Sequence, residues 1–134
     1  MKLTLLSDPL AICRLSADDA VPEWAMIGEF VSITHTTDEL SIVCAAKNVP
    51  AEENVPSSVK ADRGWRVLKV EGPLDLALTG VLASLANPLA DAKINLFAVS
   101  TFDTDYLLVK EYNLARACDV LRQAGHVVAT APPT

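Results

Sequence analysis

Two carboxylates lie two residues apart at the start of an apolar run in the second half of the chain. Asp103 and Asp105 belong to the stretch STFDTDYLLV (100–109), in which small and polar residues surround Phe102 before the apolar segment begins. Such a pair fits four roles: a metal site, an acid–base pair for catalysis, a binding site for a cationic ligand, or a hairpin turn. The hairpin turn is one of the four because aspartate favours turns, where its side chain hydrogen-bonds its own backbone.

A metal site is poorly supported by the residues around the pair. The D-T-D spacing lacks the further oxygen ligands and the glycine at the sixth position that a calcium loop requires. Neither His35 nor His126 has a second histidine three or four residues away, as zinc motifs on helices do. We therefore expect no metal and no cofactor.

Composition narrows the class of protein. The chain has 134 residues, is 51% hydrophobic and carries a formal net charge of -6, which is typical of a compact acidic domain. No stripe of Lys and Arg is present, which argues against nucleic-acid binding. No apolar window reaches the ~20 residues of a membrane span, and none reads as a signal peptide. Cys13, Cys44 and Cys118 lie in apolar runs without CxxC spacing, as expected for buried free thiols in the reducing cytoplasm.

The second half of the chain has the clearer pattern of elements. We expect strands at 65–72, 94–100 and 106–111, and a short one from His126 to Thr130. Apolar residues at helical spacing predict a helix over 74–92, on positions Leu78, Val81, Leu82, Leu85 and Leu89. Asn87-Pro88 predicts a kink or a restart in it. A second helix is expected over 113–125, with Asn113 as N-cap and Gly125 as its stop. This order is β-α-β-β-α-β, the ferredoxin-like arrangement of an α+β fold.

The first half reads as mostly β. Residues 2–7 and 10–16 predict one hairpin around Asp8-Pro9, and residues 30–37 and 40–46 predict another. Residues 47–64 hold two prolines and little periodicity, so we expect a linker or irregular loop there. This segment predicts a boundary between two domains, at 1–62 and 63–134.

Catalysis has some support from the acidic residues near the predicted turn. Glu71, Asp75, Asp103 and Asp105 fall near one end of the predicted sheet, where two carboxylates could act as acid and base. No nucleophile elbow, phosphate loop or cofactor fingerprint accompanies them. We therefore expect a protein that is not an enzyme.

The tract from Gly72 to Glu111 resembles an ACT domain of the CASTOR type, the amino-acid-sensing branch of that family. TGVLA (79–83) and AKIN (92–95) stand where ACT domains carry their first-helix and helix–strand motifs, with Lys93 where the family often has glycine. STFDTDY is similar to the Ser-Thr-Phe-x-x-Asp tract of arginine-sensing relatives. The resemblance implies a βαββαβ ACT domain, preceded by a degenerate, mostly β ACT-like unit, and a homodimer.

The resemblance also implies a set of ligand-binding residues. Carried over by position, an amino-acid pocket would be lined by Gly80, Val81, Ser100, Thr101, Phe102 and Asp105. The residues agree with this chemistry: a helix start at Gly80 offers free N–H groups to a carboxylate, and Asp105 offers an acceptor to a cation. Simpler interpretations stay open. Gly80 could allow close packing of the helix on the sheet, Phe102 could belong to the core, and Asp103 could serve only the turn.

Two functional hypotheses follow. The first is a regulatory, cytoplasmic module that binds a free amino acid or a similar small zwitterion. The second is an interaction module that oligomerises without a small ligand. An enzyme is a third class, and only the cluster of acidic residues supports it. The sequence names neither the ligand nor a regulated partner.

Overall fold

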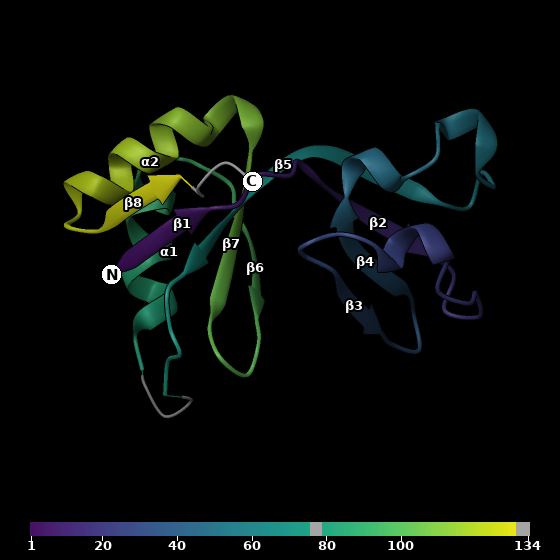
Figure 1. Cartoon of the computed structure of the whole chain (residues 1–134), viewed down its shortest axis with the longest axis horizontal. Helices are drawn as coiled ribbons and strands as arrows, with labels where there is room; N and C mark the ends of the chain where they lie inside the picture. Colours follow the sequence, from purple (N-terminus) through teal and green to yellow (C-terminus); the bar gives the residue numbers. More distant parts are fainter. Residues whose placement is uncertain (76–78, 131–134) are drawn as a thin grey trace. The chain divides into compact units, whose positions relative to one another are not determined.

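The structure is a computed structural model, and it describes residues 1–75 and 79–130. These fall into two compact units (Figure 1). The helical unit consists of Met1–Ser7 together with Arg66–Thr134, and the β unit consists of Asp8–Trp65. The chain passes from the β unit to the helical unit inside strand β5 (Lys60–Val70).

The helical unit is a five-stranded sheet with two helices. Its strand order is β6-β7-β5-β1-β8. Besides β5, the elements are β1 (Lys2–Leu5), α1 (Val81–Asp91), β6 (Phe97–Ser100), β7 (Asp105–Lys110), the short 3-10 helix η4 (Glu111–Asn113), α2 (Leu114–Gln123) and β8 (Val127–Thr130). From β5 onward the order is β-α-β-β-α-β, which confirms the predicted α+β, ferredoxin-like fold.

Strand β1 departs from the prediction. It does not form a hairpin with residues 10–16 but pairs antiparallel with β5 and parallel with β8, so that Leu3 lies opposite both Val70 and Val128. The predicted hairpin is therefore wrong. The physical reason is burial: Leu3 and Leu5 alternate, and both join the core of the helical unit.

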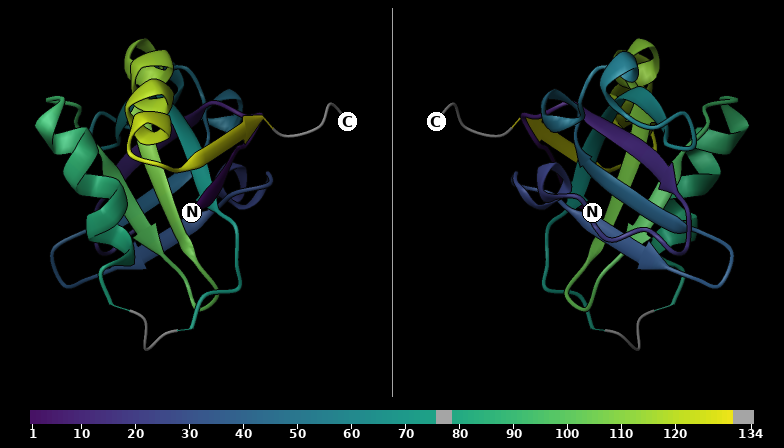
Figure 2. Two further views of the ribbon diagram at one scale, coloured as in Figure 1. Left: turned by 90° about the vertical axis from the view of Figure 1, so that its left-hand side faces the viewer. Right: turned by 90° about the vertical axis from the view of Figure 1, so that its right-hand side faces the viewer.

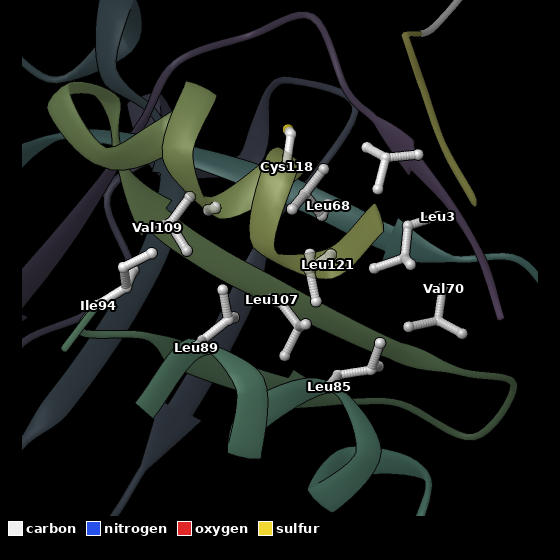
Figure 3. Close-up of a cluster of buried hydrophobic side chains, with 12 residues drawn as sticks. Leu3, Leu68, Val70, Leu85, Leu89, Ile94, Leu107, Val109, Cys118 and Leu121 are labelled. Carbon is white, nitrogen blue, oxygen red and sulfur yellow. The ribbon is translucent and has the colours of Figure 1, made fainter. Parts of the chain in front are cut away.

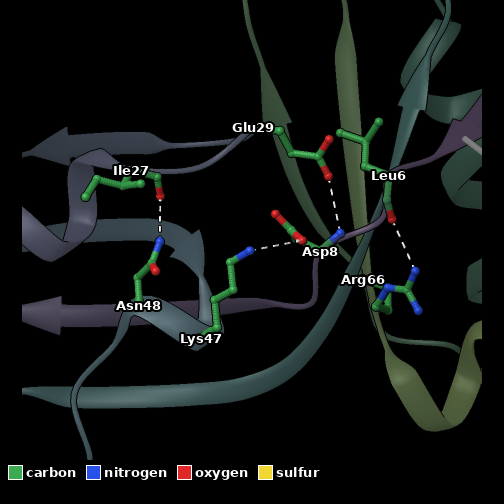
Figure 4. A network of polar contacts seen from close by, with 7 residues as sticks. All are labelled: Leu6, Asp8, Ile27, Glu29, Lys47, Asn48 and Arg66. Carbon is green, nitrogen blue, oxygen red and sulfur yellow. Dashed lines mark hydrogen bonds and ion pairs between the residues drawn. The ribbon is translucent and has the colours of Figure 1, made fainter. Parts of the chain in front are cut away.

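The pairing of β1 also changes the division of the chain. The predicted boundary at 62/63 kept residues 1–7 with the first half, whereas the structure groups them with residues 66–134. The other boundary falls between Trp65 and Arg66, three residues from the predicted position. The Arg66 guanidinium donates to the Leu6 carbonyl at 3.1 Å, within the helical unit (Figure 4).

Both helices pack on one face of the five-stranded sheet (Figure 2). Alternate strand residues point into this core, and the helices add one apolar side each (Figure 3). The buried residues are Leu3, Leu68, Val70, Leu85, Leu89, Ile94, Leu107, Val109, Ala117, Cys118, Leu121 and Val128.

Helix α1 begins later than predicted, at Val81, and its predicted position Leu78 lies outside the described residues. Pro88 lies inside the helix, so the expected restart at Asn87 does not occur. Because proline has no N–H, the Ser84 carbonyl loses its helical donor. His126 Nε2 lies 3.0 Å from that carbonyl oxygen and can donate to it.

Helix α2 ends as the sequence predicts. Gly125 has a φ of 96°, its N–H donates to the Arg122 carbonyl at 3.0 Å, and the His126 N–H donates to the Leu121 carbonyl at 3.0 Å. This pair of bonds is the Schellman motif, which satisfies the last carbonyls of a helix. Asn113 precedes the helix but makes no side-chain cap bond.

The β unit is a sheet in the order β3-β4-β2-β5. Besides the start of β5, its elements are β2 (Leu10–Leu15), β3 (Ser32–His35), β4 (Leu40–Ala45) and the 3-10 helices η1 (Glu23–Met26), η2 (Ala46–Asn48) and η3 (Glu52–Asn54). The hairpin of β3 and β4 is confirmed. Within this unit, Lys47 pairs with Asp8, whose N–H bonds to Glu29, and Asn48 bonds to Ile27 (Figure 4).

The expected loop over 47–64 ends earlier than predicted, because β5 starts at Lys60. The register of β2 and β5 shifts between Leu10 and Ile12, which indicates a bulge. Gly64, with a φ of 84°, lies in the shifted part of β5. Arg63 donates to three carbonyls of the preceding loop, those of Ala46, Val49 and Pro50.

The cysteines are free and buried, as predicted. A hydrogen bond from the Cys44 thiol lowers the pKa of Cys13, and the same bond, with burial, raises the pKa of Cys44. Burial raises the pKa of the Cys118 thiol. Among the described residues, no helix has both the length and the apolar character needed to cross a membrane.

Candidate functional site

The STFDTDY stretch forms the hairpin turn between β6 and β7. Ser100 pairs with Asp105 at the ends of the two strands. The Thr101 N–H donates to the Thr104 carbonyl at 2.9 Å, and the Thr104 N–H lies 3.3 Å from Thr101 Oγ1. Phe102 and Asp103 therefore lie at the tip of a tight turn, and the threonines supply its hydrogen bonds.

The segment that follows β5 docks on this turn. The Leu74 N–H donates to the Asp103 carbonyl at 2.7 Å, and Thr104 Oγ1 donates to the Val70 carbonyl at 2.6 Å. Gly72 makes the approach possible, because a Cβ there would lie 2.9 Å from the Leu74 nitrogen and 3.2 Å from the Asp103 oxygen. The docking fixes the turn against the end of β5.

Thr104→Val should loosen this docking. Thr104 is 4% exposed, and valine keeps its shape but removes the donor to Val70. We expect the free energy of unfolding to fall by about 1–2 kcal/mol, since a buried carbonyl loses a partner. Urea denaturation followed by circular dichroism measures it. Thr130→Val, at an exposed position of β8, is the control, and an equal loss in both variants would contradict the assigned role of the Thr104 hydroxyl.

A cavity of about 210 Å³ opens beside the turn, between it and the start of α1. Five of the six predicted site residues line it: Val81, Ser100, Thr101, Phe102 and Asp105. The remaining lining residues are Leu74, Asp75, Asp103 and Thr104. The structure thus brings the turn and the helix start together, as the resemblance implied.

Gly80, the sixth predicted residue, does not line the cavity but immediately precedes α1. Its φ of 77° is left-handed, and its carbonyl accepts the first helical bond, from the Ser84 N–H at 2.9 Å. A Cβ at Gly80 would meet nothing within 4 Å, so close packing does not explain the glycine. The backbone conformation explains it.

Gly80→Ala should therefore cost about 1 kcal/mol in the free energy of unfolding, because alanine adopts a left-handed φ at a penalty. Gly80→Asn should cost less, since asparagine tolerates that conformation better than other residues. Thermal unfolding of the three proteins gives the ranking. Equal stability of the alanine variant and the parent would contradict the conformational explanation.

Three carboxylates line the cavity, from Asp75, Asp103 and Asp105, and none of the described residues that line it is Lys, Arg or His. Asp105 is half-buried, and within the described chain its side chain makes no hydrogen bond or ion pair. Asp103 is exposed. Across the described residues, no group of three His, Cys, Asp or Glu is placed to hold a metal ion. The charge of the cavity favours a cationic group in it.

Phe102 is 80% exposed, so its alternative role in the core is wrong. The ring stands at the rim of the acidic cavity, where it could cover a ligand or stack on a flat cation.

The prediction missed Leu74, Asp75 and Thr104 as cavity residues, and it left Asp103 to the turn although Asp103 also lines the cavity. The sequence does point to Asp75, because its carboxylate is predicted near the same end of the sheet as Asp105. No sequence pattern points to Leu74, since a backbone hydrogen bond to Asp103 brings it to the cavity.

Comparisons with known proteins agree with this geometry. A family model described as "ACT domain" matches residues 60–123, and a second model, for an N-terminal domain, matches residues 8–52. A solved structure of a protein from Agobacterium tumefaciens is 42% identical, with a TM-score of 0.88, over 98% of this chain and 94% of that one. The chain belongs to the family of ACT-domain proteins.

Curated relatives of the chain include mammalian proteins that are named as arginine sensors. The cytosolic arginine sensor for mTORC1 subunit 1 of Bos taurus is 29% identical over 112 residues, which cover 72% of this chain and 33% of the relative. The human protein of the same name is 37% identical over 60 residues, 44% of this chain and 18% of the relative. The chain thus spans a third or less of the length of these relatives.

The regulatory subunit of aspartate kinase from Thermus thermophilus shares the fold of this ACT-domain protein. It is 10% identical, with a TM-score of 0.60, over 88% of this chain and 93% of that one. At that identity the likeness establishes the fold alone.

Proposed function

We propose that this ACT-domain protein is a regulatory module that binds a free amino acid or a similar small zwitterion carrying a cationic side chain, without catalysis. The observation that carries the proposal is the acidic cavity, in which three carboxylates meet the start of a helix and no cationic side chain is present among the described lining residues. The mammalian relatives named as arginine sensors support the same ligand class.

The two ends of such a ligand would meet different groups. The Asp105 carboxylate, half-buried and without a protein partner in the described chain, accepts from an ammonium or guanidinium group. The first N–H groups of α1, starting at Val81, have no carbonyl within the helix and favour a carboxylate. Thr101 and Phe102 add a hydroxyl and a flat cover.

Binding at this place would act on the turn. Ligand contacts to Thr101 and Asp105 hold β6 and β7 at their ends, and contacts to Val81 hold the start of α1. A ligand that binds only the folded state stabilises it by mass action. The ordered turn and helix start would then be the signal that a protein partner reads, within the cytoplasm and in a homodimer of the chain.

The second candidate function is a ligand-free interaction module. It is favoured by the two ends of the helical unit's sheet, because among the strands that the structure describes β6 pairs only with β7 and β8 only with β1. Each leaves one row of backbone groups open for a strand of another chain. An oligomer that ignores every amino acid in size-exclusion chromatography would favour this function over the first.

A thermal-shift screen of the twenty amino acids tests the proposed function. Arginine and lysine should raise the melting temperature by several degrees at ~100 times their dissociation constant, since saturation then contributes about 2.7 kcal/mol. Glutamate should not, because the cavity carboxylates repel it. A folded protein whose melting temperature responds to none of the twenty at millimolar concentration would refute amino-acid binding.

A further inference from the structure

A second cavity lies on the other side of the same hairpin turn. It has a volume of about 350 Å³ and is lined by Lys69, Gly72, Pro73, Thr101, Asp103, Thr104 and Tyr106. It shares Thr101, Asp103 and Thr104 with the acidic cavity. Ligand sites in proteins commonly start at ~300 Å³, so its size suits a small molecule.

The two cavities belong to opposite faces of one sheet. Successive side chains of a strand alternate between its faces. On β7, Leu107 and Val109 point into the core beneath the helices, which puts Asp105 on that face and Tyr106 on the other. On β5, Leu68 and Val70 point into the same core.

Lys69 lies between these two core positions of β5 and therefore belongs to the face of Tyr106. The Gly72–Pro73 segment closes this side of the turn, while Leu74 and Asp75, the next residues, line the acidic side. A single turn thus separates an acidic cavity from one that contains a lysine.

The Lys69 ammonium group is available to a ligand. Lys69 is half-buried and, among the described residues that line its cavity, is the only Lys, Arg or His; the carboxylate there, that of Asp103, is exposed. Within the described chain it makes no ion pair or hydrogen bond. Glu71, two residues further on the same face, accepts instead from the Thr4 hydroxyl at 2.6 Å. A half-buried cation without a protein partner favours an anion in its cavity.

We propose that the Lys69 cavity is a second binding site, which takes a small molecule through its carboxylate group. The Lys69 ammonium group forms the ion pair, in a cavity that Gly72 and Pro73 also line. This site does not depend on the proposed function. Since the cavities share three residues of the turn, occupancy of one changes the affinity of the other, by the same factor in both directions.

Amide chemical shifts of the ¹⁵N-labelled chain test the second site. The probes are acetate, succinate and glutarate, with glutaramide as the uncharged match of glutarate. At least one carboxylate should give saturable shifts at Lys69, Thr101 and Tyr106, and glutaramide should give none. Lys69→Met should weaken that binding by about tenfold or more, because it removes a charged partner. Lys93→Met, an exposed lysine of the same unit, should not.

Three outcomes would overturn the second site: no saturable shift with any carboxylate, equal shifts with glutaramide, or equal binding by the Lys69→Met and parent chains. A parent-like spectrum of the Lys69→Met variant shows that it folds. The thermal response of this variant to arginine separates the two sites. If arginine still raises its melting temperature, the proposed function is intact, and the titrations with carboxylates alone decide the second site.

Discussion

Asp105→Asn is expected to weaken the binding of a cationic amino acid by about 10- to 100-fold. The change replaces a charged acceptor with a neutral amide of nearly the same shape, and hydrogen bonds to charged groups contribute about 1.5–3 kcal/mol. Asp105 is half-buried at the start of β7, where solvent screens its charge less than that of the exposed Asp103. Asp103→Asn should therefore have the smaller effect.

Isothermal titration calorimetry of the variants with arginine or lysine gives the affinities. Asp91→Asn, at the exposed C-terminal end of α1, removes the same charge away from the cavity and should bind like the parent. The Asp105→Asn variant should keep its fold, since within the described chain its carboxylate has no partner to lose. An Asp105→Asn variant that binds as tightly as the Asp91→Asn variant would remove Asp105 from the site.

Leu107→Ala is expected to lower the free energy of unfolding of the helical unit by about 3 kcal/mol. Leu107 is 0% exposed and lies on the inner strand β7, on the face that α1 and α2 cover (Figure 3). Truncation of a fully buried leucine loses its transfer free energy and leaves a cavity, together about 2–5 kcal/mol. This loss is a large part of the stability of a small domain.

Denaturation followed by two signals assigns the loss to one unit. Both α-helices belong to the helical unit, so its unfolding changes the helical circular dichroism, whereas Trp24 and Trp65 belong to the β unit and report on it by fluorescence. The control is Leu82→Ala, because Leu82 is 37% exposed on α1 and should cost about 1 kcal/mol or less. Equal losses from Leu107→Ala and Leu82→Ala would contradict the assigned core.

The cavity-lining turn could be predicted from the sequence because its residues are neighbours in the chain. A tight hairpin holds Ser100, Thr101, Phe102 and Asp105 together whatever the rest of the fold does. The contribution of Val81 came from the family resemblance and the helical spacing. Leu74 reaches the cavity through a backbone hydrogen bond to Asp103, and Asp75 follows it in the chain. Side-chain periodicity does not predict a backbone bond of this kind.

The long-range features of the fold were the ones that the sequence did not predict. Strand β1 has four residues, and its partners Val70 and Val128 lie far along the chain, whereas a local turn at Asp8-Pro9 suggested a nearby partner. The start of β5 was missed because its residues 60–63 are exposed and three of the four are charged. Lys93 was noted as a departure from the family's glycine, and its φ of 59° shows why glycine suits that turn.

A crystal structure of the chain with the amino acid that raises its melting temperature most tests the central claim directly. The account predicts that the ligand occupies the acidic cavity, with its cationic group hydrogen-bonded to the Asp105 carboxylate and its own carboxylate facing the N–H groups at the start of α1. A ligand bound at another place on the chain, with the cavity between Val81 and Asp105 left empty, would contradict it.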